Sequence, residues 1–524
     1  MMRHAAGFLA GWLVLAVLPA RAESYDLVIR NGRVVDGTGN PAWFADIAVR
    51  EGRIVRVGQV NGEAKEEIEA RGLMVAPGFI DVHTHADELA EMPRAENFVR
   101  MGVTTVVAGN CGSSTLDFKR FFREIEATNV AINIACLVGH NSVRSRAMGG
   151  DFNRAPTPEE MQRMKELLKT AMEEGAAGLS TGLIYLPGVF AQTDEIVELA
   201  KVIAPYGGIY ASHMRHEDAE IFKALDEVFR VAREAGVRAE VSHIKLSGPA
   251  AWGQADKVLE YLERARAEGL DITQDQYTYT ASSTGISQLI PETARDGGQA
   301  KFVERARDPA QRAKIAAEME KHLFSRGRTN FAYAVIASCR SHPALNGLNL
   351  VQAAQKLRGG DTLADQIETI LDLQAAGGAS GVFHGMSEAD LQVFLRHPNT
   401  MAASDSGLRK FGVGVPHPRG YGNNARVLAR YVRELKVLRL EDAVRKMTSL
   451  PATTFRLKDR GLIREGCWAD LTLFDPGKVQ DRATYEDPHQ YPAGIPWVIV
   501  NGVVVIRNGE HTGAKAGKAL RRES

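Results

Sequence analysis

Apolar and polar positions alternate with two different periods along the chain, and each period occupies its own part of the sequence. Near both ends, β-branched residues form short runs interrupted by Asn-Gly or Glu-Gly pairs, in residues 25–36, 48–58 and 497–506. Runs of this kind around a two-residue turn predict β-hairpins, the first one turning at Asn31-Gly32. Residues 470–474 add another strand-like run. We therefore expect a small β-sandwich domain built from both termini.

Between these ends, strand-like runs alternate with segments of helical apolar spacing such as 161–174, 194–204 and 217–235. The strand candidates are residues 78–82, 104–108, 130–138, 177–180, 209–212, 239–242, 271–276 and 401–404. Strands that alternate with helical crossovers indicate an α/β protein with a parallel sheet. No glycine-rich dinucleotide fingerprint opens the first unit, so the pattern favours a (β/α)8 TIM-like barrel over an open doubly wound sheet.

The interval from Tyr277 to Thr400 is too long for one crossover, so we expect an insertion before the last barrel strand, within about residues 285–345. Inside it, Asp308 as N-cap and Pro309 at the first helical position predict a helix over 309–324. Residues 331–338 suggest an additional strand. The expected division is a signal peptide over 1–22, a composite β-sandwich domain from 23–76 and 456–524, and a (β/α)8 barrel with the insertion over 77–455.

The first residues predict export. Arg3 and His4 precede an apolar run over residues 5–18, and Ala20-Arg21-Ala22 forms a small-x-small cleavage pattern. The run is too short to span a bilayer comfortably. We expect a cleaved secretory signal, no stable membrane insertion after cleavage, and a mature protein in the periplasm or outside the cell.

Composition and charge exclude several classes of partner. The chain has 64 basic and 64 acidic residues, and loss of the two arginines of the signal would leave a charge of −2. This balance gives no electrostatic footprint for nucleic acid or an anionic membrane. With 44% apolar residues, a large buried core is expected. The four cysteines lack CxxC spacing, so no disulfide framework is indicated, and the state of Cys136, Cys339 and Cys467 stays open, as does the oligomeric state.

Polar side chains follow the ends of five predicted barrel strands, where the active sites of such barrels lie. They are His83 and His85 after the first strand, Cys111 after the second, His213 after the fifth, His243 after the sixth and Asp405 after the eighth. Imidazole, thiolate and carboxylate are the ligands that Zn²⁺ accepts, and a catalytic zinc keeps one position open. The sequence therefore predicts a zinc site. Further candidates near it are His140, His216, His384 and His417.

Eight short motifs extend this pattern over nearly the whole mature chain. They are Pro77–His85, Gly109–Gly112, Gly182–Gly188, Ser212–Arg215, Ser242–Lys245, Tyr279–Thr284, Ser404–Ser406 and His417–Arg419. With them the chain resembles the N-acyl-D-amino-acid deacylase (D-aminoacylase) family of the amidohydrolase superfamily. The first motif is general to that superfamily, whereas the cysteine and the His-Pro-Arg segment are specific to this branch.

The resemblance implies zinc-dependent hydrolysis of the amide bond of N-acyl-D-amino acids, a metal-dependent amidohydrolase activity on small substrates that carry a free carboxylate. It implies that Cys111, His213 and His243 hold a tight zinc, while His83, His85 and Asp405 line a second, weaker or vacant site. Asp405 is then also the general acid and base. The residues implied for substrate binding are Lys245, Tyr277, Ser283 and Arg419 around the carboxylate, together with Tyr185. The sequence departs from the family pattern at Arg409-Lys410, which adds positive charge beside Asp405.

Three other functions are weighed against this one. A cyclic-amide hydrolase of the dihydroorotase or hydantoinase kind would carry a metal-bridging lysine at the end of strand four, where this chain reads Gly178-Leu179-Ser180-Thr181-Gly182. A dipeptidase that releases a C-terminal D-amino acid would present the same amide and carboxylate to the site, and the sequence does not separate it from a deacylase. A non-catalytic binding protein on a degenerate barrel would have lost a ligand or the acid/base residue, and all six positions are filled.

Overall fold

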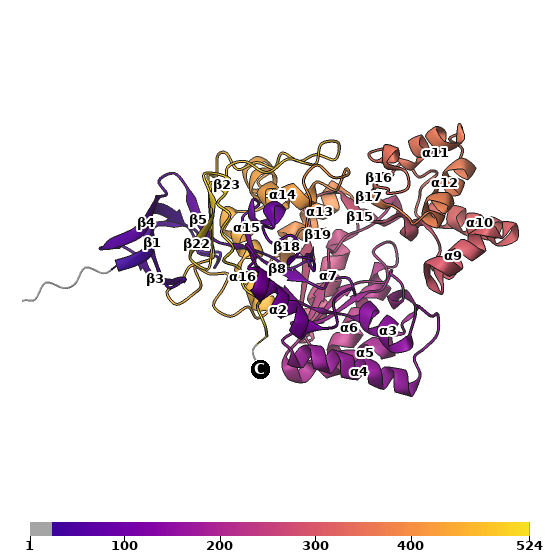
Figure 1. Cartoon of the computed structure of the whole chain (residues 1–524), viewed down its shortest axis with the longest axis horizontal. Helices are drawn as coiled ribbons and strands as arrows, with labels where there is room; N and C mark the ends of the chain where they lie inside the picture. Colours follow the sequence, from indigo (N-terminus) through magenta and orange to yellow (C-terminus); the bar gives the residue numbers. More distant parts are fainter. Residues whose placement is uncertain (1–23, 523–524) are drawn as a thin grey trace, which may run out of the picture.

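The computed structural model describes residues 24–522, so the predicted signal peptide over residues 1–22 lies outside the described residues. Three parts follow one another along the longest axis of the molecule: a β-rich domain at one end, a barrel in the middle, and an inserted subdomain at the other end (Figure 1). Among the helices of residues 24–522, none has the length and apolar character needed to cross a membrane.

The central part is an α/β barrel of eight parallel strand positions, as the sequence predicted. The strands are β6 (Phe79–Asp81), β8 (Val103–Ala108), β9 (Asn133–Cys136) continued by β10 (Val138–Gly139), β11 (Gly178–Gly182), β12 (Ile209–His213), β13 (Ala239–Val241), β14 (Ile272–Gln276) and β18 (Thr400–Ala402). The barrel closes between its last and first strands, where β19 (Ser406–Gly407) pairs in parallel with β7 (Thr84–His85). The Asp405 backbone N–H also donates to the His83 carbonyl at 2.9 Å.

Helices surround this sheet, and their apolar faces form one large buried core with the outer faces of the strands. They are α1 (Glu96–Val99), α2 (Phe118–Thr128), α3 (His140–Met148), α4 (Pro158–Glu173), α5 (Thr193–Ile203), α6 (Ile221–Ala235), α7 (Ala255–Ala267), α13 (Glu388–Arg396), α14 (Arg419–Arg426), a π-helix (Val427–Glu434), α15 (Leu440–Met447) and α16 (Ser449–Thr454). Thr157 begins α4 with a capping box to Glu160, which fixes the start of that helix.

Strands from both ends of the chain form the β-rich domain, a single nine-stranded sheet around its own apolar core. The strands are β1 (Ser24–Val34), β2 (Trp43–Arg50), β3 (Arg53–Gly58), β4 (Glu63–Glu69), β5 (Met74–Pro77), β20 (Leu471–Phe474), β21 (Trp497–Val500), β22 (Val503–Arg507) and β23 (Glu510–His511). After β23 the chain leaves this sheet and runs back along the barrel, where Ala519 bridges to Ile134.

The expected hairpin at Asn31-Gly32 is wrong, because β1 continues through both residues as one strand. The register of β1 against β2 shifts between Ile29 and Gly32, so the pair forms a β-bulge instead of a turn. A Cβ at Gly32 would lie 2.5 Å from the Val75 side chain on β5, which explains the glycine by close packing. The other two expected hairpins, β2–β3 and β21–β22, are present.

The inserted subdomain is longer than the expected 285–345. It contains β15 (Ala281–Gly285), α8 (Glu292–Arg295), α9 (Gly298–Arg307), α10 (Pro309–Ser325), β16 (Ala334–Ser338), α11 (Leu350–Arg358), α12 (Leu363–Ala375) and β17 (Ser380–His384). The last strand, β17, is central in the three-stranded sheet between β15 and β16, so the subdomain ends only there. The predicted helix after the Asp308 cap is α10, and the Asp308 side chain accepts from the Gln311 N–H.

Candidate metal centre and active site

The six predicted strand-end residues converge at the carboxyl ends of the barrel strands. They come from five strands: His83 and His85 follow β6, Cys111 follows β8, His213 ends β12, His243 follows β13 and Asp405 follows β18. Cys111, His243 and Asp405 have positive φ angles of 53°, 36° and 50°. Such a conformation costs roughly 1–3 kcal/mol for a residue with a Cβ. The surrounding fold therefore holds these three residues in a strained backbone at the site.

A thiol and three imidazoles form the centre of the cluster, and all four side chains are buried. Cys111 Sγ lies 3.3 Å from His83 Nε2, 3.5 Å from His213 Nδ1 and 3.7 Å from His243 Nε2. Zinc bonds of about 2.3 Å to sulfur and 2.0–2.1 Å to nitrogen, at a tetrahedral angle, place the two donor atoms about 3.5 Å apart. The three sulfur–nitrogen distances therefore fit a single Zn²⁺ ion, whereas His213 Nδ1 and His243 Nε2, 2.7 Å apart, lie closer than the roughly 3.3 Å between two nitrogen ligands of one tetrahedral zinc.

The electrostatics of the cluster favour a thiolate. Burial alone would raise the pKa of the Cys111 thiol, but His83 and His213 beside it lower that pKa well below its usual range. A thiolate is the form of cysteine that binds a metal. The chemistry of the donor set thus agrees with its geometry.

A second group of donors adjoins the first. His83 Nε2 and His85 Nε2 lie 3.7 and 3.2 Å from Asp405 Oδ1, and Arg419 Nη1 lies 2.9 Å from Asp405 Oδ2. Burial alone would raise the pKa of Asp405, but Arg419 and His83 lower it well below its usual range. Asp405 is therefore ionised at neutral pH and can accept a proton.

Glu217 belongs to the site although the sequence analysis did not single it out. Its Oε1 lies 2.9 Å from His243 Nδ1 and 2.5 Å from Lys245 Nζ. Burial would raise the pKa of Glu217, but Lys245 and the two histidines His213 and His243 lower it below its usual range. Glu217 lies four residues after His213, but the segment between them is a loop. The sequence placed residue 217 at the start of a helical segment, but α6 begins only at Ile221, so the pattern gave no sign that Glu217 contacts the site.

Two more carboxyl groups, Asp275 and Glu240, support the cluster from inside the barrel. Asp275 Oδ2 lies 3.1 Å from His83 Nδ1, which orients that imidazole toward Cys111. Burial, together with the neighbouring Asp275, raises the pKa of Glu240 well above its usual range. Burial also opposes ionisation of Asp275, yet His83 lowers the pKa of Asp275. We read the pair as one carboxylate on Asp275 and one neutral carboxylic acid on Glu240. In the sequence, Asp275 and Glu240 could have been recognised as acidic residues inside predicted, buried strands.

The predicted carboxylate-binding residues surround the ring of Tyr277. The Arg419 guanidinium lies 4.5 Å and the Lys245 ammonium 5.8 Å from the ring centroid. The Tyr277 hydroxyl and Arg419 Nε are buried and have no hydrogen-bond partner among the described residues. An unpaired buried polar group costs about 1–3 kcal/mol. A carboxylate placed here would satisfy both donors.

Ser283 and Tyr185 complete the predicted set. The Ser283 carbonyl accepts from Arg419 Nη2 at 3.5 Å, and Ser283 lies on β15, so the inserted subdomain contributes to the site. The Tyr185 ring lies 5.0 Å from the His213 ring, and its hydroxyl is 3.1 Å from Thr284 Oγ1. The structure thus brings every predicted site residue to one end of the barrel.

The other four candidate histidines lie outside this cluster of donors. His140 is buried against Glu195 at 2.8 Å, and His216 lies 3.5 Å from Glu220. His384 packs on the ring of Tyr485. His417 Nε2 donates to the Ala281 carbonyl, 2.8 Å away, and its Nδ1 accepts from the Arg419 backbone N–H. His417 thus contacts two site residues, Arg419 through its backbone N–H and Tyr277 through an edge-to-face arrangement of the two rings, whose centroids are 6.2 Å apart.

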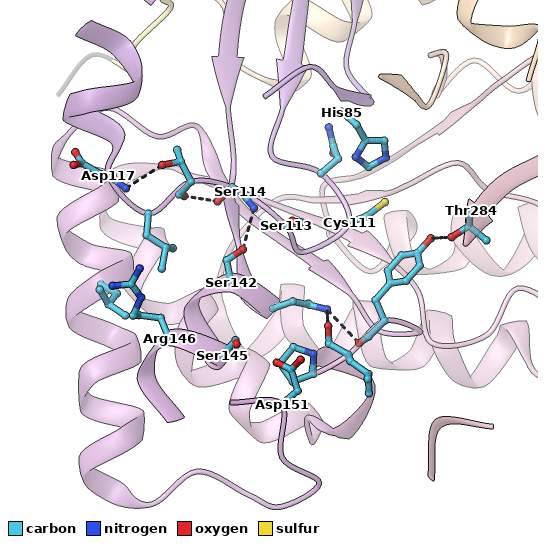
Figure 2. A pocket seen from close by; sticks show the side chains of 18 of the residues that line it. His85, Cys111, Ser113, Ser114, Asp117, Ser142, Ser145, Arg146, Asp151 and Thr284 are labelled. Carbon is cyan, nitrogen blue, oxygen red and sulfur yellow. Dashed lines mark hydrogen bonds between the residues drawn. The ribbon is translucent and has the colours of Figure 1, made fainter. Parts of the chain in front are cut away.

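A cavity of about 1330 Å³ opens from His85 and Cys111 (Figure 2). Its walls come from the loop after β8, from α3, and from the loop after β11, and Ser283 and Thr284 of β15 close one side. The Asn141 amide donates to the carbonyls of Gly182, Tyr185 and Leu186, which fixes one wall. The cavity gives a solute direct access to the candidate metal centre.

A (β/α)8 barrel with histidines, a cysteine and a carboxylate at its strand ends defines a metal-dependent hydrolase of the amidohydrolase type. A family model described as "Amidohydrolase family" matches residues 66–506. Two similar proteins of Alcaligenes xylosoxydans xylosoxydans are a D-aminoacylase, 37% identical, and an N-acyl-D-glutamate deacylase, 36% identical. Each alignment covers 96% of this chain and 98% of the relative.

A similar solved structure is the N-acyl-D-glutamate deacylase of Bordetella bronchiseptica, complexed with zinc and a phosphonate inhibitor that mimics the tetrahedral intermediate. It has a TM-score of 0.81 and 34% identity, over 95% of this chain and 100% of that chain. The chain therefore belongs to the amidohydrolase family, in the branch of the D-aminoacylases. The resemblance and the fold class predicted from the sequence are confirmed.

Proposed function

We propose that this protein is a zinc-dependent deacylase that hydrolyses the amide bond of N-acyl-D-amino acids to a carboxylate and a free D-amino acid. The observation that carries the proposal is the convergence of the Cys111 and histidine donors with Asp405 and Arg419 at one barrel mouth. The deacylase names and the zinc complex of the relatives support it.

In this proposal Cys111, His213 and His243 hold the tight zinc, and His83, His85 and Asp405 form the second group, whose donors lie within 4.8 Å of one another. When bound, zinc polarises the substrate carbonyl and lowers the pKa of water toward roughly 7. Glu217 and Asp275 orient His243 and His83 through the ring nitrogens that face away from Cys111.

Asp405 is the residue that moves the proton. Its ionised carboxylate takes a proton from the attacking water and passes it to the departing amine nitrogen as the amide C–N bond breaks. Arg419 keeps Asp405 ionised before the reaction, because its guanidinium lies 2.9 Å from Oδ2. The same side chain has an unpaired Nε, which can bind the substrate carboxylate together with Tyr277 and Lys245. Ser283 and Tyr185 then bound the substrate on the side of the inserted subdomain.

A stereochemical screen on purified protein of measured zinc content tests this proposal. We expect hydrolysis of N-acetyl-D-amino acids, loss of activity after removal of metal by a chelator, and its return on addition of Zn²⁺. Hydrolysis confined to N-acetyl-L-amino acids would overturn the assignment. A lysine is absent from β11, which argues against a cyclic-amide hydrolase, and an assay with hydantoin and dihydroorotate should find no turnover.

We also propose that the chain is exported. The support is the basic start, apolar run and small-x-small pattern of residues 1–22. N-terminal sequencing of the protein from the fractionated native host should find a chain that begins at Glu23 in the periplasm or the medium. A chain in the cytoplasm that keeps residues 1–22 would contradict this.

A further inference from the structure

The cavity beside the candidate metal centre is much larger than an acetyl group requires. Its volume is about 1330 Å³, and it reaches from His85 and Cys111 past a row of serines to Arg146 and Asp151 (Figure 2). The carboxylate-binding donors Arg419, Lys245 and Tyr277 do not line it. On the proposed function, the amino-acid part of the substrate lies against those donors. The cavity then receives the acyl part.

Hydroxyl groups with free hydrogen-bonding capacity line this acyl side. The side-chain hydroxyls of Ser113 and Ser145 have no hydrogen-bond partner among residues 24–522. The Ser142 hydroxyl accepts only from the Ser114 N–H, so its own proton is available. A solute that carries both donors and acceptors could pair with all of these groups.

Two charged side chains on the cavity wall also lack an ion-pair partner in the described part of the chain. Arg146 is exposed on α3, and Asp151 is half-buried in the loop that follows α3. The third charged wall residue, Asp117, differs because its carboxylate caps α2 by accepting from the Arg120 N–H. Asp151 is thus the carboxylate of this wall that is free to bind a cation.

A hydrocarbon acyl chain would leave the polar groups of this wall unpaired. It would cover hydroxyls and charges without replacing the hydrogen bonds that water makes to them. Aliphatic surface comes mainly from Leu116, Leu167, Leu186 and Pro187, and polar lining residues lie between them. A peptide, in contrast, brings an N–H and a carbonyl at every residue and ends in an ammonium group.

We propose that the acyl part of the preferred substrate is a short peptide, so that the enzyme removes a C-terminal D-amino acid from peptides of three or more residues. The peptide backbone pairs with the serine hydroxyls, and its ammonium end binds near Asp151. Water adds to the carbonyl carbon of the last peptide bond, its C–N bond breaks, and the D-amino acid leaves with the transferred proton on its nitrogen. This specificity rests on the proposed function and deepens it.

Three substrates with the same D-residue test the proposal: N-acetyl-D-leucine, N-hexanoyl-D-leucine and L-Ala-L-Ala-D-Leu. An apolar acyl pocket would raise kcat/KM about four-fold for each added methylene, or more than 100-fold from acetyl to hexanoyl. We expect less than a ten-fold rise for hexanoyl and at least a ten-fold rise for the tripeptide. A tripeptide ratio below ten overturns the peptide proposal, whatever the hexanoyl value is. Inactivity on all three, N-acetyl-D-leucine included, would instead count against the deacylase function itself.

Asp151→Asn tests the ammonium contact. We expect kcat/KM for the tripeptide to fall at least five-fold and that for N-acetyl-D-leucine to stay within two-fold of the wild type. Arg123→Gln is the matched control, since Arg123 is exposed on α2 and does not line the cavity. An equal loss on both substrates, or no loss on the tripeptide, would overturn the assignment of Asp151.

Discussion

Asp405→Asn is the sharpest test of the proposed proton transfer. The amide keeps the shape of the side chain but cannot take a proton from water. Loss of a positioned general acid and base lowers kcat by roughly 10²–10⁴, which corresponds to about 3–5 kcal/mol in activation free energy. The upper half of this range is expected, because Asp405 is only 8% exposed and bulk water has little room to replace it.

The substitution also removes the charge that faces Arg419 at 2.9 Å, and breaking a buried ion pair costs about 3–5 kcal/mol of stability. Asp470→Asn is the matched control for this cost. Asp470 forms a buried ion pair with Arg460 and accepts from the Asn133 amide at the amino end of β9, the opposite end of the barrel. Both variants should unfold at a lower temperature than the wild type, while the control should keep its kcat.

The assay is steady-state hydrolysis of N-acetyl-D-leucine at saturating substrate, with zinc content measured on the same samples. We expect Asp405→Asn to retain zinc, because Cys111 lies against His213 and His243 and not against Asp405. If this variant keeps its zinc and more than a tenth of the wild-type kcat, Asp405 is not the proton carrier and the mechanism is wrong.

Three further predictions concern single side chains. Cys111→Ser should reduce the zinc content measured after dialysis at least ten-fold, because a serine hydroxyl does not ionise as a cysteine thiol does. Retention of stoichiometric zinc would contradict Cys111 as a ligand. Tyr277→Phe should raise KM about ten-fold. The melting temperature should change little, since the buried hydroxyl that is removed has no hydrogen-bond partner in the described chain. An unchanged KM would refute a role of Tyr277 in carboxylate binding. Lys446→Met should change the pH dependence of stability. Burial lowers the pKa of Lys446 to about 7. Between pH 7.5 and 9.5 the unfolded chain therefore binds a proton at this lysine that the folded chain has lost. The free energy of unfolding of the wild type consequently rises by about 1.4 kcal/mol per pH unit because of this group. In denaturant titrations, the free energy of unfolding of the variant minus that of the wild type should therefore fall by about 1.4 kcal/mol per pH unit over this range. Parallel pH profiles of the two proteins would contradict the prediction.

The predicted strands are present and the predicted ligand residues lie at their ends, because the signals for both are local. His83 and His85 follow directly after a buried apolar strand. The residues next to a position are enough to predict that it lies at a strand end. The Asp308-Pro309 start of α10 is equally local. The hairpin predicted at Asn31-Gly32 is wrong because the conformation there depends on a residue distant in the sequence. The same dipeptide suits a hairpin and a bulge, and the choice depended on Val75, which is far along the chain on β5.

The end of the inserted subdomain could not be read from the sequence either. Residues 346–384 have the helix-then-strand pattern of an ordinary barrel unit, and only the antiparallel pairing of β17 with β15 and β16 assigns them to the insertion. Glu217 shows the same limit at the site. The helical pattern of residues 217–235 includes Glu217, yet the residue lies in the loop before α6, and only its contacts with His243 and Lys245 show that it belongs to the site.

The sequence by itself determined the barrel, the terminal β-strands and the types of side chain available for a metal, because hydrophobic period and strand ends depend on neighbouring residues. The tertiary structure decided which of those side chains meet. His85 and Asp405 are 320 residues apart and Cys111 and His213 are 102 apart, yet barrel closure places each pair within 3.5 Å. It also decided the size and polarity of the acyl-side cavity, since the walls of that cavity come from separate loops whose proximity no local pattern records.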